Sequence, residues 1–251
     1  MKIIATYSIK GGVGKTAAAV NVGWFAARDG VRTLLWDLDP QAAATWLFRI
    51  KPRVKGGGKA LVRRRRPVDT AIRATDFDGL DLLPADFSYR HLDLVLDGTN
   101  RPLKGLARVV APLADEYDLV LLDCAPGITL ASESVFRAAD ALLVPVVPTT
   151  LSQRTLDQLA TFVGQDRVDA DVLPFFSMVD GRKRLHREVM ATLPEAYPGM
   201  LRCAIPAATD VERMGVHRAP VAVTAPRSRA AAAFDGLWEE LRERLSLSMS
   251  I

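Results

Sequence analysis

Seven residues near the start of the chain, at positions 10–16, have the types and spacing that bind phosphate. They are Lys-Gly-Gly-Val-Gly-Lys-Thr and directly follow an apolar run at 3–7. Glycines let the backbone turn through conformations closed to other residues, so successive N–H groups can face phosphate oxygens. Lys15 would neutralise β- and γ-phosphate charge, and the Thr16 hydroxyl is a hard oxygen ligand suited to Mg²⁺. We therefore predict a nucleotide-binding loop made by Lys10, Gly11, Gly12, Val13, Gly14, Lys15, Thr16 and Ala17.

The loop departs from the usual phosphate-loop pattern at one position. That pattern places glycine six residues before the lysine, where this chain has Ile9, and a second lysine, Lys10, follows at once. This lysine-first form resembles the deviant Walker A loop of the ParA/MinD family of ATPases. In that family the extra lysine reaches the phosphates of the other subunit, so the resemblance implies that Lys10 acts across a dimer interface. A charge that completes only a partner's site makes dimerisation depend on the bound nucleotide.

Two further elements carry carboxylates at the ends of apolar runs. Asp37 and Asp39 belong to Asp-Leu-Asp-Pro-Gln, and alternation along a strand would place both on one side, facing the phosphate loop if the strands 3–7 and 31–36 are neighbours. The pattern resembles the Asp-x-Asp-Pro-Gln element of the family, which implies that Asp39 orients or activates the attacking water. Asp123 ends the run 119–122 in what looks like a Walker B strand. The resemblance implies that Asp123 holds Mg²⁺ together with Thr16.

Segments 139–152 and 176–180 continue the resemblance. In the family, the loops after the last strands hold the adenine, which here implicates the residues Met178, Asp180, Pro206 and Val211. The chain departs from the family at Ala17, where a second threonine often follows the first. It therefore lacks one hydroxyl that could contact the α-phosphate.

The elements that must position these residues alternate between strand and helix. The chain has 251 residues, of which 49% are hydrophobic, enough to bury a full core. Short apolar runs indicate buried parallel strands, and the periodic stretches between them indicate helices. We predict a single α/β domain over 1–251 of P-loop NTPase type, a mostly parallel sheet with helices on both faces. The expected strands are 3–7, 31–36, 80–83, 119–122, 141–147, 172–178 and 201–205, and the expected helices are 17–28, 103–113, 131–138, 156–163, 185–193 and 230–245.

Positive charge is concentrated in one segment, although the net charge of the chain is only +4. Eight basic residues and no acidic residue occur between 51 and 66. Three consecutive glycines at 56–58 and the flanking Pro52 and Pro67 predict a mobile, Gly-rich basic loop at about 51–67. Such a loop could bind nucleic acid phosphates, anionic lipid or an acidic partner, or serve only to keep the protein in solution.

Basic residues recur in several late loops. A dimer would double them into a two-sided basic surface, and non-specific DNA affinity grows with each phosphate neutralised. The other interpretation is that they are scattered, solvated side chains. The candidate DNA-binding residues are Arg182, Lys183, Arg184, Arg187, Arg213, Arg218, Arg227 and Arg229.

The end of the chain bears on a membrane-cycling function. A membrane-cycling protein needs a terminal amphipathic helix that is basic. In 237–246 the acidic residues offset the basic ones, and the tail 246–251 is uncharged. No run of eighteen apolar residues is present, so we expect no membrane association and a cytoplasmic, nucleoid-associated protein. Cys124 and Cys203 lack ligand spacing, which disfavours a cluster-bearing reductase.

The resemblance covers nearly the whole chain and predicts a Mg²⁺-dependent, ParA-like ATPase. Its ATP state would be a homodimer with two nucleotides at the interface, and that dimer would bind DNA non-specifically. Hydrolysis, stimulated by a ParB-like or cargo-adaptor protein, would release the DNA and so partition or position DNA or another intracellular cargo. The alternatives are a MinD-like membrane-cycling ATPase and a metabolic enzyme of the same P-loop class.

Overall fold

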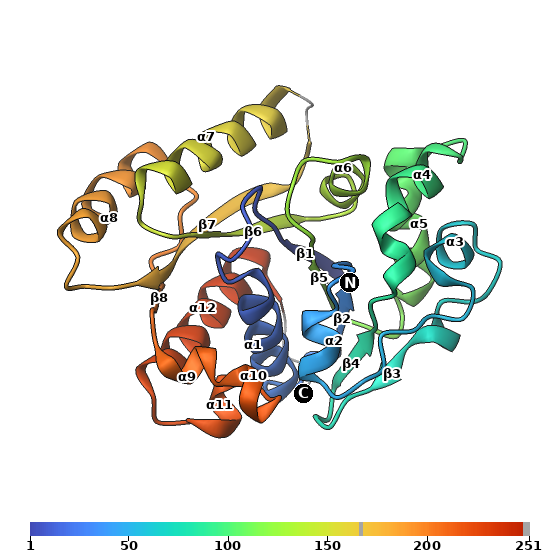
Figure 1. The fold of residues 1–251 in the computed structure, drawn as a ribbon, viewed down its shortest axis with the longest axis horizontal. Helices are drawn as coiled ribbons and strands as arrows, with labels where there is room; N and C mark the ends of the chain where they lie inside the picture. Colours follow the sequence, from blue (N-terminus) through green and yellow to red (C-terminus); the bar gives the residue numbers. More distant parts are fainter. Residues whose placement is uncertain (166–167, 248–251) are drawn as a thin grey trace.

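The computed structural model describes residues 1–165 and 168–247. Within these ranges the chain forms an eight-stranded sheet (Figure 1). The strand order is β3-β4-β2-β5-β1-β6-β7-β8. All neighbours in it are parallel except β3 and β4, which are antiparallel. The strands are β1 (Lys2–Thr6), β2 (Thr33–Asp37), β3 (Arg73–Ala74), β4 (Leu80–Leu83), β5 (Leu119–Asp123), β6 (Ala141–Val146), β7 (Asp171–Val179) and β8 (Ala204–Pro206).

Helices connect the strands, and local signals start several of them. The helix at 130–136 begins with a capping box in which Thr129 and Ser132 each bond the backbone N–H of the other. The last helix is capped by the Ser228 hydroxyl, which accepts from the N–H of Ala231. The α-helices are α1 (Lys15–Arg28), α2 (Ala43–Leu47), α3 (Gly57–Val62), α4 (Leu92–Asp97), α5 (Gly105–Val110), α6 (Leu130–Phe136), α7 (Thr150–Gln165), α8 (Arg184–Ala196), α9 (Thr209–Glu212), α10 (Met214–His217), α11 (Val221–Thr224) and α12 (Arg229–Leu245), with 3₁₀ turns η1 (Asp69–Ala71), η2 (Phe87–His91), η3 (Pro102–Lys104) and η4 (Ala111–Leu113).

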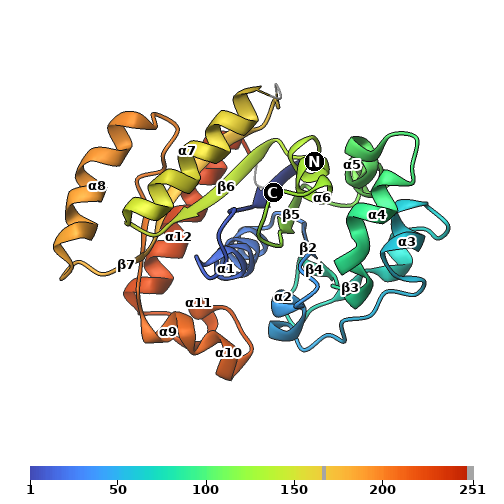
Figure 2. The ribbon, with the colours of Figure 1, turned by 45° about the horizontal axis from the view of Figure 1, so that its top comes forward.

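Alternate side chains of the central strands enter two separate apolar cores. Ile3 and Ala5 of β1 face one core, whereas Ile4 faces the other. The first core is closed by α3 to α8, and the second by α1, α2 and α9 to α12. Helices therefore cover both faces of the sheet (Figure 2), and the predicted fold class is confirmed.

The strand order brings the phosphate loop and the carboxylates to one edge of the sheet. Because β5 lies between β1 and β2, Asp123 is in register with Thr6 on one side and with Asp37 on the other. The loop after β1 leads directly into α1, and the carboxyl ends of β1, β2 and β5 all open at this edge. Ligand sites of open α/β sheets lie at this kind of edge.

The structure differs from the sequence-based elements in several places: the short helices α2, α4 and α9 to α11 were not predicted, and β8 begins at Ala204 and not at 201. The predicted helix at 103–113 is a short α5 between two 3₁₀ turns, each of which contains a proline, Pro102 or Pro112, that has no N–H to donate. An antiparallel edge strand, β3, was not predicted, because its two residues are exposed and carry no apolar pattern.

The segment 51–67 is not the plain loop that we predicted from its glycines and prolines. Its residues 57–62 form α3, and the side chains of Val54, Leu61 and Val62 are buried in the first core. The glycines allow close packing: a Cβ on Gly57 would lie 2.4 Å from Ser88 Oγ. The N–H of Gly58 donates to the same Ser88 hydroxyl at 2.9 Å. The basic side chains are thus carried by an ordered, partly buried element.

The C-terminal helix α12 packs on the sheet. Its residues Leu237, Trp238, Leu241 and Leu245 are buried in the second core, as expected for a docked helix. The last four residues, 248–251, which we expected to form a short uncharged tail with 246–247, lie outside the described residues. Among the helices of the described ranges, none combines the length and apolar character needed to span a bilayer.

Candidate functional site

The phosphate loop has the backbone geometry for which its glycines were singled out. Gly12 and Gly14 have φ values of 70° and 99°, in the left-handed region that favours glycine. At Gly14 a side chain is also excluded by space, because a Cβ there would lie 2.8 Å from Ser177 Oγ. Val13 is buried between these two glycines and anchors the loop. Helix α1 begins at the next residue, so its N-terminal N–H groups open toward the loop.

The two lysines of the loop have different surroundings. Lys15 is only 7% exposed, and its ammonium group donates to the carbonyl oxygen of Lys10 at 3.3 Å. Burial lowers the pKa of Lys15, and the carboxylates of Asp123 and Asp39 oppose this shift. The side chain of Lys10 is exposed. Lys15 therefore faces inward, whereas Lys10 lies where a second molecule can reach it.

Asp123 lies beneath the loop and is almost completely buried, with 1% exposure. Its Oδ1 accepts from the Thr6 hydroxyl at 3.3 Å. Its Oδ2 is the buried side-chain atom that has no hydrogen-bond partner among the described residues. Burial raises the pKa of this carboxyl to about 8, the charge of Asp37 adds to the shift and Lys15 opposes it. An unpaired carboxylate oxygen near the Thr16 hydroxyl is the donor set that Mg²⁺ prefers, so these residues fit that ion.

Asp37 and Asp39 do not act as a pair. We expected both to face the phosphate loop if β1 and β2 were neighbours, but β5 lies between these strands. Oδ2 of Asp37 accepts from the Thr45 N–H and hydroxyl at 2.8 and 2.7 Å, and Oδ1 accepts from the Asp39 N–H at 3.2 Å. Asp37 thereby ties the start of α2 to the end of β2. Burial raises the pKa of Asp37 to about 6. Asp39 is partly exposed and faces the loop, with Oδ1 bonded to the Gln41 N–H at 2.9 Å.

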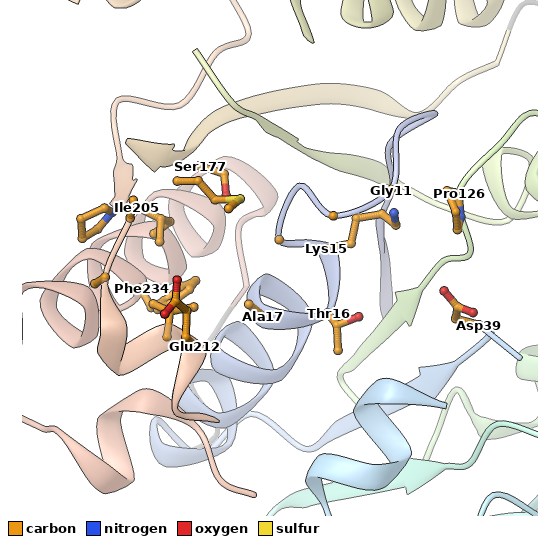
Figure 3. Close-up of a pocket in the computed structure, with 17 residues that line it drawn as sticks. Gly11, Lys15, Thr16, Ala17, Asp39, Pro126, Ser177, Ile205, Glu212 and Phe234 are labelled. Atoms are coloured by element: carbon orange, nitrogen blue, oxygen red, sulfur yellow. The ribbon is translucent and has the colours of Figure 1, made fainter. Parts of the chain in front are cut away.

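A cavity of about 500 Å³ opens over the phosphate loop and the start of α1. In Figure 3, Lys15 and Thr16 lie in its middle, with Asp39 and Pro126 on one side and Phe234 on the other. The predicted residues that line it are Gly11, Gly12, Gly14, Lys15, Thr16, Ala17, Asp39, Met178, Pro206 and Val211.

Four predicted residues do not line this cavity. Val13 and Asp123 are buried beneath the loop, and Lys10 lies outside at its exposed turn. Asp180 is held elsewhere by an ion pair with Arg182, at 2.9 Å between Oδ1 and Nε, which lowers the pKa of Asp180 to about 2. The structure therefore does not place Asp180 against a nucleotide base.

Seven residues that line the cavity were not predicted from the sequence. They come from the turn after β5, from β7, β8, the loop after β8, α9 and α12, and each belongs to an element whose sequence looks like ordinary core or loop. The missed residues are Pro126, Ser177, Ile205, Ala207, Ala208, Glu212 and Phe234.

The candidate DNA-binding residues occupy two areas, the turn into α8 and the helices α9 to α12. Several already have partners: Arg182 pairs with Asp180, Arg184 with Glu188 at 2.6 Å, and Arg187 donates to the Gly181 carbonyl. Arg218 differs from the rest, because it donates to the Trp46 carbonyl at 2.8 Å and lies on the Trp46 ring. The remaining candidates are exposed: Lys183, Arg213, Arg227 and Arg229.

The sequence is similar to a family model and to curated proteins. Residues 1–171 match the model of a family described as an AAA domain. Sporulation initiation inhibitor protein Soj of Bacillus subtilis is 29% identical, over 96% of this chain and 98% of Soj. A ParA family protein of Chlamydia muridarum is 28% identical, over 96% of this chain and 97% of that protein.

Solved structures share the fold over nearly the whole chain. A Cyanothece McdA variant in complex with ATP has a TM-score of 0.85 at 19% identity, covering 100% of this chain and 98% of that one. Cobyrinic acid a,c-diamide synthase of Mycobacterium smegmatis, with bound ADP and magnesium, has a TM-score of 0.82 at 24% identity, covering 99% and 97%. The septum site-determining protein MinD of Pyrococcus horikoshii, complexed with Mg-ADP, has a TM-score of 0.81 at 21% identity, covering 100% and 99%.

Proposed function

The chain belongs to the ParA/MinD family of deviant Walker A ATPases, and on that premise we propose that it is a ParA-like ATPase that dimerises around ATP and binds DNA. The observation that carries the proposal is the arrangement around the cavity. Two lysines, one buried and one exposed, flank a glycine loop above the unpaired Oδ2 of Asp123. The exposed lysine distinguishes this site from one that is complete within a single chain.

ATP and Mg²⁺ are the cofactors that the residues fit. The triphosphate would lie along Gly11 to Thr16, against the N-terminus of α1, and Lys15 would neutralise its β- and γ-oxygens. The Thr16 hydroxyl and Asp123 Oδ2 would hold Mg²⁺. When bound, the ion neutralises charge on the phosphate oxygens and fixes their positions. The adenine would rest against Met178 and Pro206 at the far side of the cavity.

Asp39 would orient the water that attacks the γ-phosphate. Its Oδ1 is fixed by the Gln41 N–H, and no donor among the described residues reaches its Oδ2. A carboxylate held in this way can accept a hydrogen bond from water and position that water while its own orientation stays fixed. Lys10 and Lys15 would stabilise the charge that develops on the transferred phosphoryl group.

The exposure of Lys10 supports dimerisation. Its exposed side chain would reach the phosphates of a second copy and complete that copy's site. Because only a triphosphate offers the charge that this lysine needs, the dimer would form with ATP and separate after hydrolysis.

The ATP-bound dimer would bind DNA without sequence preference. The basic side chains at the turn into α8 and at α9 to α12 would each neutralise phosphates, and doubling them in a dimer strengthens binding steeply. A ParB-like or cargo-adaptor protein would stimulate hydrolysis and release the DNA. The protein would then act in the cytoplasm, on the nucleoid, to partition DNA or position another cargo.

The MinD-like and metabolic alternatives have less support from the molecule. The apolar residues of α12 are buried in the second core, so they cannot insert into a lipid surface. A synthetase needs a polar substrate site beside the nucleotide. The groove that adjoins the cavity past Thr16 and Ala17 is lined mostly by apolar side chains such as Trp46, Leu47 and Met214.

Sedimentation of the purified protein with Mg-ATP, Mg-ADP or no nucleotide tests the proposal. We expect a dimer with ATP alone, and a Lys10→Ala variant that stays monomeric while it still binds ATP. Lys104→Ala, which removes an exposed lysine away from the cavity, should dimerise like the parent protein. ATP-dependent dimers of the Lys10→Ala variant would contradict the role of Lys10.

A further inference from the structure

A second cavity, of about 390 Å³, lies between the end of α3 and the α5–η4 segment. Figures 1 and 2 both show α3 beside α5, at the opposite end of the molecule from α8. None of its lining residues also lines the nucleotide cavity. Four exposed arginines line this second cavity, Arg64, Arg65, Arg66 and Arg108, together with buried apolar residues that include Leu61 and Val109. Positive charge beside apolar side chains is a composition suited to an anionic organic ligand.

Contacts among the described residues do not explain why the four arginines line the same cavity. Within the described ranges, no side chain forms an ion pair or hydrogen bond with any of these guanidinium groups. The cavity also contains Asp69 and Glu116, but the Asp69 carboxylate accepts from the Thr70 N–H at 2.8 Å. Four guanidinium groups against two carboxylates leave an excess of positive charge that the protein does not neutralise itself.

The end of helix α3 determines where the side chain of Arg64 leaves the backbone. Helix α3 ends with paired bonds from the Arg64 N–H to the Leu61 carbonyl and from the Arg65 N–H to the Ala60 carbonyl, each 2.9 Å. In this helix ending the first residue beyond the cap is usually glycine, because it must be left-handed. Arg64 adopts it with a φ of 51°. The chain thus places a long basic side chain where glycine would be less strained, and that side chain lines the cavity.

We propose that this cavity is a binding site for a small phosphorylated organic molecule. A phosphate ester carries a charge of about −1.5 to −2 at neutral pH, which matches the excess positive charge of the four arginines. A guanidinium group can donate two parallel bonds to a phosphate or to a carboxylate, but a phosphate ester has three acceptor oxygens and the larger charge, so it can engage more than one of these arginines. The organic part of the ligand would rest on Leu61, Val109 and Leu113. The buried apolar residues favour such a ligand over duplex DNA, whose phosphates lie on a convex surface.

The test is calorimetric titration of the full-length protein with phenyl phosphate, in the presence of saturating Mg-ADP so that the phosphate loop is filled. We expect one phenyl phosphate to bind per chain, more tightly than inorganic phosphate, which lacks the apolar part. Arg65→Ala and Arg108→Ala should each weaken binding about tenfold, the loss of one charge-assisted bond. Arg64→Gly should also weaken binding while its melting temperature stays the same or rises, an outcome that a merely structural role would not give.

Arg63→Ala is the matched control. It removes the same charge from the same run, but Arg63 does not line the cavity and lies instead near Gly98. Its affinity for phenyl phosphate should stay within about twofold of the parent protein. An equal loss in Arg63→Ala and Arg65→Ala would reduce the effect to diffuse charge and overturn the proposal. It would also be overturned if phenyl phosphate did not bind, or if only a short DNA duplex required Arg65 and Arg108.

Discussion

Asp37 and Asp39 are two residues apart, and the structure gives them different surroundings. Asp37 is completely buried, and both of its oxygens accept bonds from Thr45 and Asp39. Asp39 lines the nucleotide cavity with one oxygen bonded to Gln41. A carboxylate whose lone pairs are taken by backbone donors stabilises a turn, whereas one with an unused oxygen can orient water.

Substitution of these two carboxylates should separate catalysis from stability. We expect Asp39→Ala to lower kcat for ATP hydrolysis by about 100-fold or more with little change in ATP affinity, since only the positioning of water is lost. Asp37→Asn, which replaces an acceptor oxygen by a donor opposite Thr45 or Asp39, should lower the free energy of unfolding by about 1–3 kcal/mol. Steady-state kinetics and urea unfolding measure the two effects. The assignment fails if Asp39→Ala hydrolyses ATP at the parental rate.

At the scale of elements, α3 depends on glycines that allow close packing. Gly57 has a φ of 63°, and a Cβ on it would meet both Oγ and Cβ of Ser88, at 2.4 and 3.1 Å. We expect Gly57→Ala to destabilise the protein by about 1–3 kcal/mol, since strain and overlap add. Gly181→Ala, where a Cβ would meet nothing within 4 Å, should change stability by less than about 0.5 kcal/mol. Equal urea midpoints for the two variants would show that α3 does not need this contact.

The turn into α8 depends on a buried histidine. Nδ1 of His186 accepts from the N–H of Asp180 at 3.1 Å, which requires the neutral ring. Burial lowers the pKa of His186, Lys183 adds to the shift and Asp180 opposes it. Because the unfolded chain takes up the proton first, stability is unaffected above the unfolded pKa of about 6.5 and falls as pH drops below it.

A His186→Gln variant, whose amide oxygen can accept the same bond, should lose this pH dependence. We expect the free energy of unfolding of the parent protein to fall more steeply than that of the variant between about pH 7 and 5, when both are measured in urea. The two proteins differ only at position 186, so the difference between their curves reports on that residue. Parallel curves for the two proteins would contradict the assignment to His186.

At the scale of the whole molecule, the sequence sufficed for most of the sheet and for the glycine turn between β1 and α1, because both depend on local patterns. Buried strands are short apolar runs, and the loop is a fixed spacing of glycine and lysine. Distant contacts could not be predicted in this way. The glycines of α3 looked like a flexible loop because their packing partner, Ser88, is thirty residues away, and Phe234 gave no sign that it lines the nucleotide cavity.

The candidate DNA-binding residues lie at the turn into α8 and at the helices α9 to α12. The 64–66 run, which follows α3, lies apart from them at the end of the molecule opposite α8 (Figure 1). DNA binding that depends on nucleotide needs the cavity to change how such surfaces are presented, which dimerisation does by placing two copies together. Charge alone, without this coupling, would bind DNA equally in every nucleotide state.

The most direct test of the proposed function is co-sedimentation with non-specific duplex DNA under Mg-ATP, Mg-ADP or no nucleotide, with anionic liposomes run in parallel. We expect the protein to bind DNA only in the presence of Mg-ATP, with an affinity that falls as salt is added, and not to bind liposomes in any nucleotide state. Equal DNA binding in all three states, or binding to liposomes instead of DNA, would contradict a ParA-like ATPase whose binding to the nucleoid depends on ATP.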